Sequence, residues 1–189
     1  MSATAPTGIV TFLFTDIEGS TGRWEAQTAE MEQALERHDA ALRAAVEANE
    51  GFLFKHTGDG ILAAFASPDA AIAAAIEAQR TLELPVRMGI ATGESQLRDG
   101  DYYGPTLNRA SRVMSAGHGG QILVSSASRD AVEGSQAAGI VLRTLGRYAL
   151  AGLPEPEALF QVYATDLRVK FPKLRTTAVA AQRSAARSR

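Results

Sequence analysis

Asp16 stands in a local sequence that suits the binding of a metal ion and a phosphate group. It lies at the end of an apolar run expected to form a strand, and the segment 17–21 leads from it into a helix. A carboxylate at such a turn can hold a hard cation, while backbone N–H groups at a helix start can face phosphate oxygens. Asp, Ser and Thr are also common helix N-caps, so this segment alone leaves both interpretations open.

A second aspartate, Asp59, precedes Gly60, and Asp-Gly is a preferred two-residue turn between paired strands. On the topology expected below, this hairpin can lie beside the first strand and bring Asp59 near Asp16. Two carboxylates that share a site repel each other unless a cation lies between them, so the pair indicates Mg²⁺ or Mn²⁺. His56 should point to the opposite side of its strand from Lys55, which favours a structural role for the histidine.

The segment 101–112 places an amide and a guanidinium four residues apart, at Asn108 and Arg112. On a helix this spacing puts both side chains on one face. From there they could stabilise charge on a phosphoryl group. Taken alone, the segment is more typical of a surface helix with a salt-bridged arginine.

The hydrophobic pattern predicts the elements that position these residues. The order strand, helix, two strands, helix, strand indicates a ferredoxin-like βαββαβ core. The expected fold is therefore α+β, with a mostly antiparallel sheet, helices packed on it and a C-terminal hairpin extension. We predict strands over 8–15, 52–56, 61–65, 86–92, 121–124, 140–150 and 159–163, helices over 21–50, 69–82, 106–115 and 126–132, and a polar loop over 94–101.

The composition excludes several classes of protein. A length of 189 residues fits one domain. The absence of cysteine rules out disulfides, thiolate metal sites and cysteine nucleophiles. No apolar run approaches the roughly 20 residues that cross a bilayer, and the first residues lack the pattern of a signal peptide. We therefore expect a cytoplasmic protein without membrane insertion.

The charge is unevenly distributed along the chain. Five of the 19 basic residues and none of the 21 acidic ones follow Pro172, which leaves the remainder at about −7. An acidic body argues against nucleic-acid binding. The basic segment 167–189 has no apolar pattern to bury and is expected to be a disordered, solvated tail, and residues 1–7 are expected to be disordered as well.

Together, and in this order, the motifs resemble the class III adenylate/guanylate cyclase catalytic domain, of the bacterial adenylate cyclase type. The resemblance runs from about residue 7 to residue 166, so the predicted catalytic domain covers 8–166. It rests on three segments: Phe14–Thr21, Lys55–Asp59 and Gly104–Arg112.

The resemblance implies a two-metal site. Asp16 and Asp59 match the family's metal-binding aspartates, which would hold two divalent cations, Mg²⁺ or Mn²⁺, and the backbone carbonyl of Ile17 would join the coordination. The loop that would cradle the terminal phosphates of the substrate consists of Ile17, Glu18, Gly19, Ser20 and Thr21.

The remaining matched residues imply the substrate. Lys55 and Asp101 match the pair that selects the base. Lys offers only donors and an ionised Asp only acceptors, which fits N1 and the exocyclic amine of adenine and opposes the pattern of guanine. Asn108 would orient the ribose, and Arg112 would meet charge on the α-phosphate.

The implied activity is therefore that of an adenylate cyclase, which converts ATP to cyclic AMP and pyrophosphate. In the family the metal aspartates come from one chain and the other four residues from its partner, so a homodimer with two shared sites is expected. One feature departs from many relatives, which carry a Lys in the late hairpin near Ala151; whether Arg147 or another cation replaces it stays open. The alternatives are a non-catalytic cyclase-like nucleotide-binding or regulatory module, and a diguanylate cyclase, whose Gly-Gly-Asp/Glu-Glu-Phe signature is absent.

Overall fold

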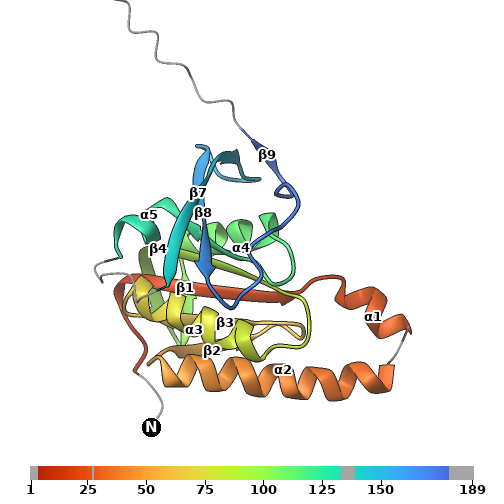
Figure 1. Ribbon diagram of the computed structural model, residues 1–189. Coiled ribbons are helices and arrows are strands. Elements are labelled where there is room, and N and C mark those ends of the chain that lie inside the picture. Colours follow the sequence, from red (N-terminus) through yellow and green to blue (C-terminus); the bar gives the residue numbers. More distant parts are fainter. Residues whose placement is uncertain (1–3, 27, 133–138, 179–189) are drawn as a thin grey trace, which may run out of the picture.

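The computed structural model describes residues 4–26, 28–132 and 139–178 (Figure 1). The described strands form one mixed sheet in the order β2-β3-β1-β4-β6-β8-β7-β9, with β5 paired to β4. The strands are β1 (Gly8–Ile17), β2 (Phe52–His56), β3 (Ile61–Phe65), β4 (Val86–Arg98), β5 (Asp101–Tyr103), β6 (Ile122–Ser125), β7 (Ile140–Ala149), β8 (Glu157–Ala164) and β9 (Thr177–Ala178). The helices are α1 (Ser20–Ala26), α2 (Thr28–Ala48), α3 (Pro68–Thr81), α4 (Pro105–Ala116) and α5 (Ser126–Asp130).

The first four long strands confirm the expected βαββαβ core. β1 lies between β3 and β4 and runs antiparallel to both, and β2 lies outside β3. The parallel pairing of β4 with β6 then extends the sheet to the β7–β8 hairpin. The predicted α+β class, mostly antiparallel sheet and C-terminal hairpin extension are therefore confirmed.

β1 is the central strand because its side chains are apolar on both faces. Leu13 and Ile17 pack with α2 and α3 on one face, while Phe12 and Phe14 pack toward α4 on the other. Figure 1 shows α3 across the near face of the sheet and α4 behind it. Phe12 is fully buried, so its truncation to alanine is expected to cost about 3–5 kcal/mol of stability.

The packing of α4 fixes the helix that carries two of the candidate residues. A Cβ at Gly89 on β4 would lie 2.3 Å from the backbone nitrogen of Met114. Only glycine allows the helix and the strand to approach so closely. The α4 backbone is therefore held rigidly against the middle of the sheet.

The predicted loop over 94–101 is wrong. β4 continues to Arg98, and the chain then returns as β5. Asp99 and Gly100 form the turn, with φ values of 52° and 81°, the positive values that a tight hairpin turn requires and that Asp-Gly readily adopts. The polar composition of the segment concealed a hairpin, one face of which packs against the core through Leu97 and Tyr102.

Two smaller expectations also need correction. The helix predicted over 21–50 is instead two helices, α1 and α2. The β2–β3 connection is a four-residue loop, 57–60, in which the N–H of Thr57 donates to the carbonyl of Gly60 at 3.0 Å. Positive φ falls at Gly58 (92°) and not at Asp59, so the loop is not the two-residue Asp-Gly turn.

Both ends of the chain are more ordered than expected, as far as they are described. Ala5 packs against the core, and the hydroxyl of Tyr102 donates to the carbonyl of Pro6 at 2.7 Å. Burial raises the pKa of Tyr102 to about 12, so this hydroxyl stays protonated and can donate. Residues 1–3 lie outside the described residues.

Residues 167–178, here called the C-terminal strap, also pack on the domain. The side-chain amide of Gln161 donates to the carbonyl of Val169 at 3.0 Å, and β9 pairs with β7. The expectation of a disordered tail therefore does not hold for the strap, and residues 179–189 lie outside the described part. In the described residues, no helix combines the length and the apolar character needed to span a membrane.

Candidate active site

The structure brings the two aspartates to the same end of β1. The N–H of Ile17 donates to the carbonyl of Asp59 at 3.0 Å, and the hydroxyl of Ser20 donates to the Asp59 carboxylate at 2.8 Å. The N–H of Ile61 donates to the hydroxyl of Thr15 at 2.9 Å. These three contacts anchor the 57–60 loop beside the residues that flank Asp16.

Gly60 is what allows this close approach. A Cβ at this position would lie 1.8 Å from the carbonyl oxygen of Thr15 and 3.0 Å from Cα of Asp16. No side chain fits there without moving the loop away from β1. The glycine after Asp59 therefore serves the spacing of the two aspartates and not the turn that sequence reasoning assigned to it.

Gly60→Ala is accordingly expected to lower the free energy of unfolding by about 1–3 kcal/mol, the usual cost of an overpacked site. Urea unfolding followed by circular dichroism measures this change. The control is Gly22→Ala, because Gly22 lies in α1 with open space around its Cβ position and gains helix propensity. Equal stability of the Gly60→Ala variant and the wild type would contradict the packing argument.

Asp16 is paired with an arginine that sequence reasoning missed. Nε and one terminal nitrogen of Arg87 donate to the two carboxylate oxygens of Asp16 at 2.6 and 2.5 Å. The exposed fractions of the two side chains are 18% for Arg87 and 17% for Asp16. Arg87 lies directly opposite Asp16 in the β1–β4 register, and such a cross-strand relation becomes visible only when the pairing of the strands is known.

The segment 17–21 has two parts that point to different neighbours. Ser20 reaches Asp59, as described above, and Gly19 has a φ of 70°, a left-handed conformation that favours glycine. The carboxylate of Glu18 turns the other way, accepting from the N–H of Gly119 at 2.8 Å and pairing with Arg175. The loop expected to cradle phosphates is therefore tied to the aspartate site on one side and to the chain after α4 on the other.

Lys55 and Asp101 meet although they are 46 residues apart, with Nζ of the lysine 3.3 Å from a carboxylate oxygen. A register shift after Leu53 places Lys55 opposite Leu62, on the sheet face that α4 covers. His56 takes the other direction, and its Nε2 lies 3.2 Å from a guanidinium nitrogen of Arg43 on α2. The contact agrees with the structural role expected for the histidine.

Asn108 and Arg112 lie one turn apart on α4, and both are exposed. Among the described residues, no hydrogen bond or ion pair joins either side chain to Asp16, Asp59 or the 17–21 loop. Asn108 lies beside the β7–β8 connection, where a Cβ at Gly152 would be 3.8 Å from its amide nitrogen. The pair is therefore presented to solvent next to the late hairpin.

The late hairpin itself carries Arg147, the candidate to replace the lysine that many relatives have near position 151. Arg147 is exposed on β7, and its guanidinium donates to the carbonyl of Pro156 at 2.7 Å across the hairpin. The strap also reaches the hairpin, where the hydroxyl of Thr176 donates to the carbonyl of Ala149 at 2.5 Å. Sequence reasoning treated this second segment as a tail.

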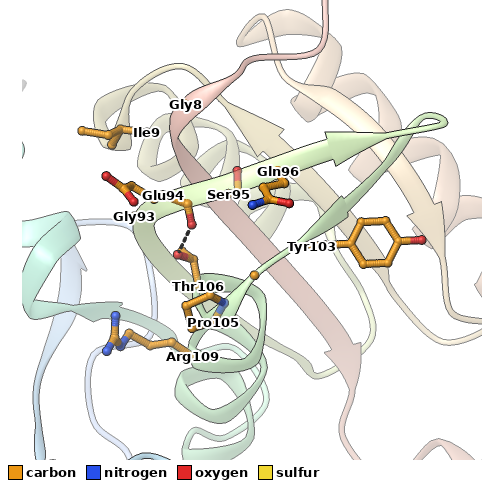
Figure 2. Close-up of a pocket in the computed structure, with 11 residues that line it drawn as sticks. Gly8, Ile9, Gly93, Glu94, Ser95, Gln96, Tyr103, Pro105, Thr106 and Arg109 are labelled. Atoms are coloured by element: carbon orange, nitrogen blue, oxygen red, sulfur yellow. Dashed lines mark hydrogen bonds between the residues drawn. The ribbon is translucent and has the colours of Figure 1, made fainter.

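A hollow of about 660 Å³ lies elsewhere (Figure 2). It is lined by the start of β1, the outer part of β4 and the start of α4, and contains none of the predicted site residues. Arg109, the one arginine in its lining, has its Nε 3.3 Å from the carboxylate of Glu157. Thr106 is likewise engaged, donating to the carbonyl of Glu94 at 2.9 Å. Asp16, Asp59 and the 17–21 loop lie at the opposite end of β1.

The residues at that end fit hard divalent cations. Asp16 and Asp59 offer carboxylate oxygens, and the Ile17 backbone offers a carbonyl, the ligand types that Mg²⁺ and Mn²⁺ prefer. Asp16 already requires a positive partner, since it is largely buried and paired with Arg87. Within the described residues no cluster of three or more His, Cys, Asp or Glu side chains is present, so such a site would depend on these two carboxylates.

Comparison with known proteins finds relatives that span most of the chain. The chain is 41% identical over 180 residues to an uncharacterized protein of Mycobacterium tuberculosis, covering 93% of this chain and 63% of that protein. It is 31% identical over 214 residues to the receptor-type adenylate cyclase GRESAG 4.3 of Trypanosoma brucei brucei, covering 86% of this chain and 17% of that one.

Solved structures and family models extend the comparison. A structure of an adenylate cyclase from Trypanosoma brucei in its monomeric state superposes with a TM-score of 0.83 at 27% identity, covering 90% of this chain and 95% of that one. Residues 3–163 match the family model described as the adenylate and guanylate cyclase catalytic domain. Since this match spans most of the chain, the protein belongs to the adenylate and guanylate cyclase catalytic domain family.

Proposed function

We propose that the protein is an adenylate cyclase that converts ATP to 3′,5′-cyclic AMP and pyrophosphate. The observation that carries the choice of ATP is the pair formed by Lys55 and Asp101, 3.3 Å apart. The adenylate cyclases among the relatives support the same choice.

The pair reads the Watson–Crick edge of the base. Lys55 donates to N1 of adenine, and Asp101 accepts from the exocyclic amine. Guanine offers an N–H and a carbonyl at these positions, so both contacts would be mispaired. Each mispaired group costs about 1–3 kcal/mol, which corresponds to a preference for ATP of at least about tenfold.

In the reaction, the ribose 3′-hydroxyl gives up its proton to water, its oxygen forms a bond to the α-phosphorus, the bond from this phosphorus to the bridging oxygen breaks, and pyrophosphate leaves. Asn108 orients the ribose, and Arg112 donates to the α-phosphoryl oxygens, where negative charge develops. Asp16, Asp59 and the Ile17 carbonyl would hold two divalent cations, which would supply Lewis-acid stabilisation of the phosphoryl oxygens and increase the acidity of the hydroxyl.

Arg87 places a guanidinium beside Asp16 at the end of β1, in addition to the proposed cations. In the structure its guanidinium neutralises Asp16. With the Asp16 oxygens engaged by a cation, the five N–H donors of Arg87 are free to bind phosphate oxygens. The residue thus holds the carboxylate in place before substrate arrives and supports the triphosphate afterwards.

The site is completed by a second copy of the chain. The aspartates and the 17–21 loop form one half, while Lys55, Asp101, Asn108 and Arg112 form the other. The exposure of the α4 pair supports its use by a partner chain. Because each chain carries both halves, a two-fold symmetric homodimer holds two complete sites.

Substitution can invert the donor–acceptor pattern of Lys55 and Asp101. Lys55→Glu combined with Asp101→Ser is expected to lower kcat/KM for ATP by about a hundredfold and to raise it for GTP, because two contacts of the base are mispaired. Initial rates with each nucleotide, compared with Lys170→Ala as a charge-matched control on the strap, measure the switch. Unaltered use of ATP by the double variant would show that these residues do not read the base.

The function itself is tested by incubating the purified protein with ATP or GTP and with Mn²⁺ or Mg²⁺, followed by chromatographic identification of the product. Cyclic AMP from ATP, with little cyclic GMP from GTP, is the expected result. Nucleotide binding without any cyclic product would instead indicate a non-catalytic regulatory module.

A further inference from the structure

The C-terminal strap lies beyond residues 3–163, which the family model matches, yet it contacts the candidate site. Leu174 packs in a cluster with Val113 and Ala116 of α4. The N–H of Arg175 donates to the carbonyl of Ala116 at 2.9 Å. The strap is therefore anchored to the last turn of the helix that carries Asn108 and Arg112.

From this anchor, the side chain of Arg175 reaches the 17–21 loop. Its guanidinium forms an ion pair with the carboxylate of Glu18 and donates to Nδ1 of His118 at 3.4 Å. The other ring nitrogen of His118 lies 2.9 Å from the carbonyl of Lys173. Glu18 and His118, from two loops far apart in sequence, are thus joined by one side chain of the strap.

Glu18 connects Arg175 to the backbone of the 17–21 loop. Its N–H donates to the carbonyl of Pro85 at 2.8 Å, and its carboxylate accepts from the N–H of Gly119. Its side chain is only 26% exposed, so an ionised carboxylate there needs a positive partner. Its neighbours in the chain are Ile17, whose carbonyl is proposed to bind metal, and Gly19, whose left-handed backbone turns the loop.

We propose that Arg175 is a positioning residue of the nucleotide site: by holding Glu18, it keeps the 17–21 loop in the conformation that receives the triphosphate. This inference rests on the proposed function, since it assumes that the loop binds phosphates. It makes the strap part of the catalytic unit.

The expected signature is a change in affinity without a change in the chemical step. If the loop is correctly placed in only a tenth of the molecules without Arg175, the apparent Kd rises about tenfold, because binding must first select that fraction. At saturation all molecules are in the binding-competent form, and kcat stays close to its original value. Loss of folded protein would do the opposite, lowering kcat through the active concentration and leaving KM unchanged.

The test compares Arg175→Ala, Arg175→Lys and Lys173→Ala, with KM and kcat for ATP measured in Mn²⁺. Lys173→Ala removes the same charge from the strap, but its side chain makes no described contact with the loop. Calorimetry of the binding of α,β-methylene-ATP with Mn²⁺ gives the affinity for nucleotide independently of turnover. Glu18→Gln, alone and combined with Arg175→Ala, tests whether the arginine acts through the glutamate.

Arg175→Ala is expected to raise KM and the Kd of the analogue about tenfold, with partial recovery in Arg175→Lys and wild-type values in Lys173→Ala. In the Glu18→Gln background, Arg175→Ala should add little. Wild-type KM in Arg175→Ala, or an equal rise in Lys173→Ala, would overturn the positioning role while leaving the proposed cyclase activity standing. A wild-type protein that neither binds the analogue nor turns over ATP would instead refute the function on which the inference rests.

Discussion

Asp16→Asn and Asp59→Ala are each expected to reduce the formation of cyclic AMP by on the order of a thousandfold or more, because each removes a carboxylate from a two-metal site. Both residues lie at the end of β1, where the 57–60 loop is anchored by the hydrogen bond from Ile17 to Asp59. In the absence of either carboxylate, the remaining ligands cannot hold two cations or offset the charge of the phosphoryl group.

Asparagine is chosen at position 16 because Asp16 accepts two hydrogen bonds from Arg87. The amide keeps one acceptor, which limits the cost of leaving a buried guanidinium unpaired. The measurement is the initial rate of cyclic AMP formation in saturating Mn²⁺ and ATP, with far-UV circular dichroism to verify folding. Asp130→Ala, which removes an exposed carboxylate on α5, is the control. Activity within tenfold of wild type in either site variant would contradict the metal assignment.

The regular part of the fold could be predicted from sequence because local patterns decide it. β1 is a nearly continuous apolar run, and Ser67 caps α3, its hydroxyl accepting from the N–H of Ala70. The hairpin at Asp99 and Gly100 was missed although Asp-Gly is a strong turn signal, because most of the residues around it are polar. Its core-facing residues, Leu97 and Tyr102, become recognisable as a pair only once the two strands are paired.

The residues of the candidate site likewise fall into two groups, those that could be predicted from sequence and those that could not. The motif residues are adjacent in sequence or joined by the expected topology, and the structure brings Lys55 to Asp101 and Asp59 to β1. Arg87 and Arg175 could not be found in this way. The first depends on the register between β1 and β4, and the second on a segment without periodicity that crosses the fold to reach Glu18.

The second large effect concerns the sharing of each site between two chains. Asp59→Ala damages the half that holds metal, and Arg112→Ala damages the half that stabilises the transition state. Each homodimer should be inactive, because both of its sites contain the lesion. In a heterodimer the two lesions fall together in one site, and the other site is entirely wild type.

Mixing the two inactive variants therefore tests the shared active site most directly. Random exchange of equal amounts gives about half heterodimers with one intact site each, so the rate should return to about a quarter of the wild-type value. A mixture of Asp16→Asn and Asp59→Ala should stay inactive, because every site then lacks one aspartate. Subunit exchange is followed by energy transfer between labelled chains. Recovery to about a quarter in the first mixture alone is the result predicted for a two-fold dimer, and a mixture that exchanges subunits but forms no cyclic AMP would contradict it.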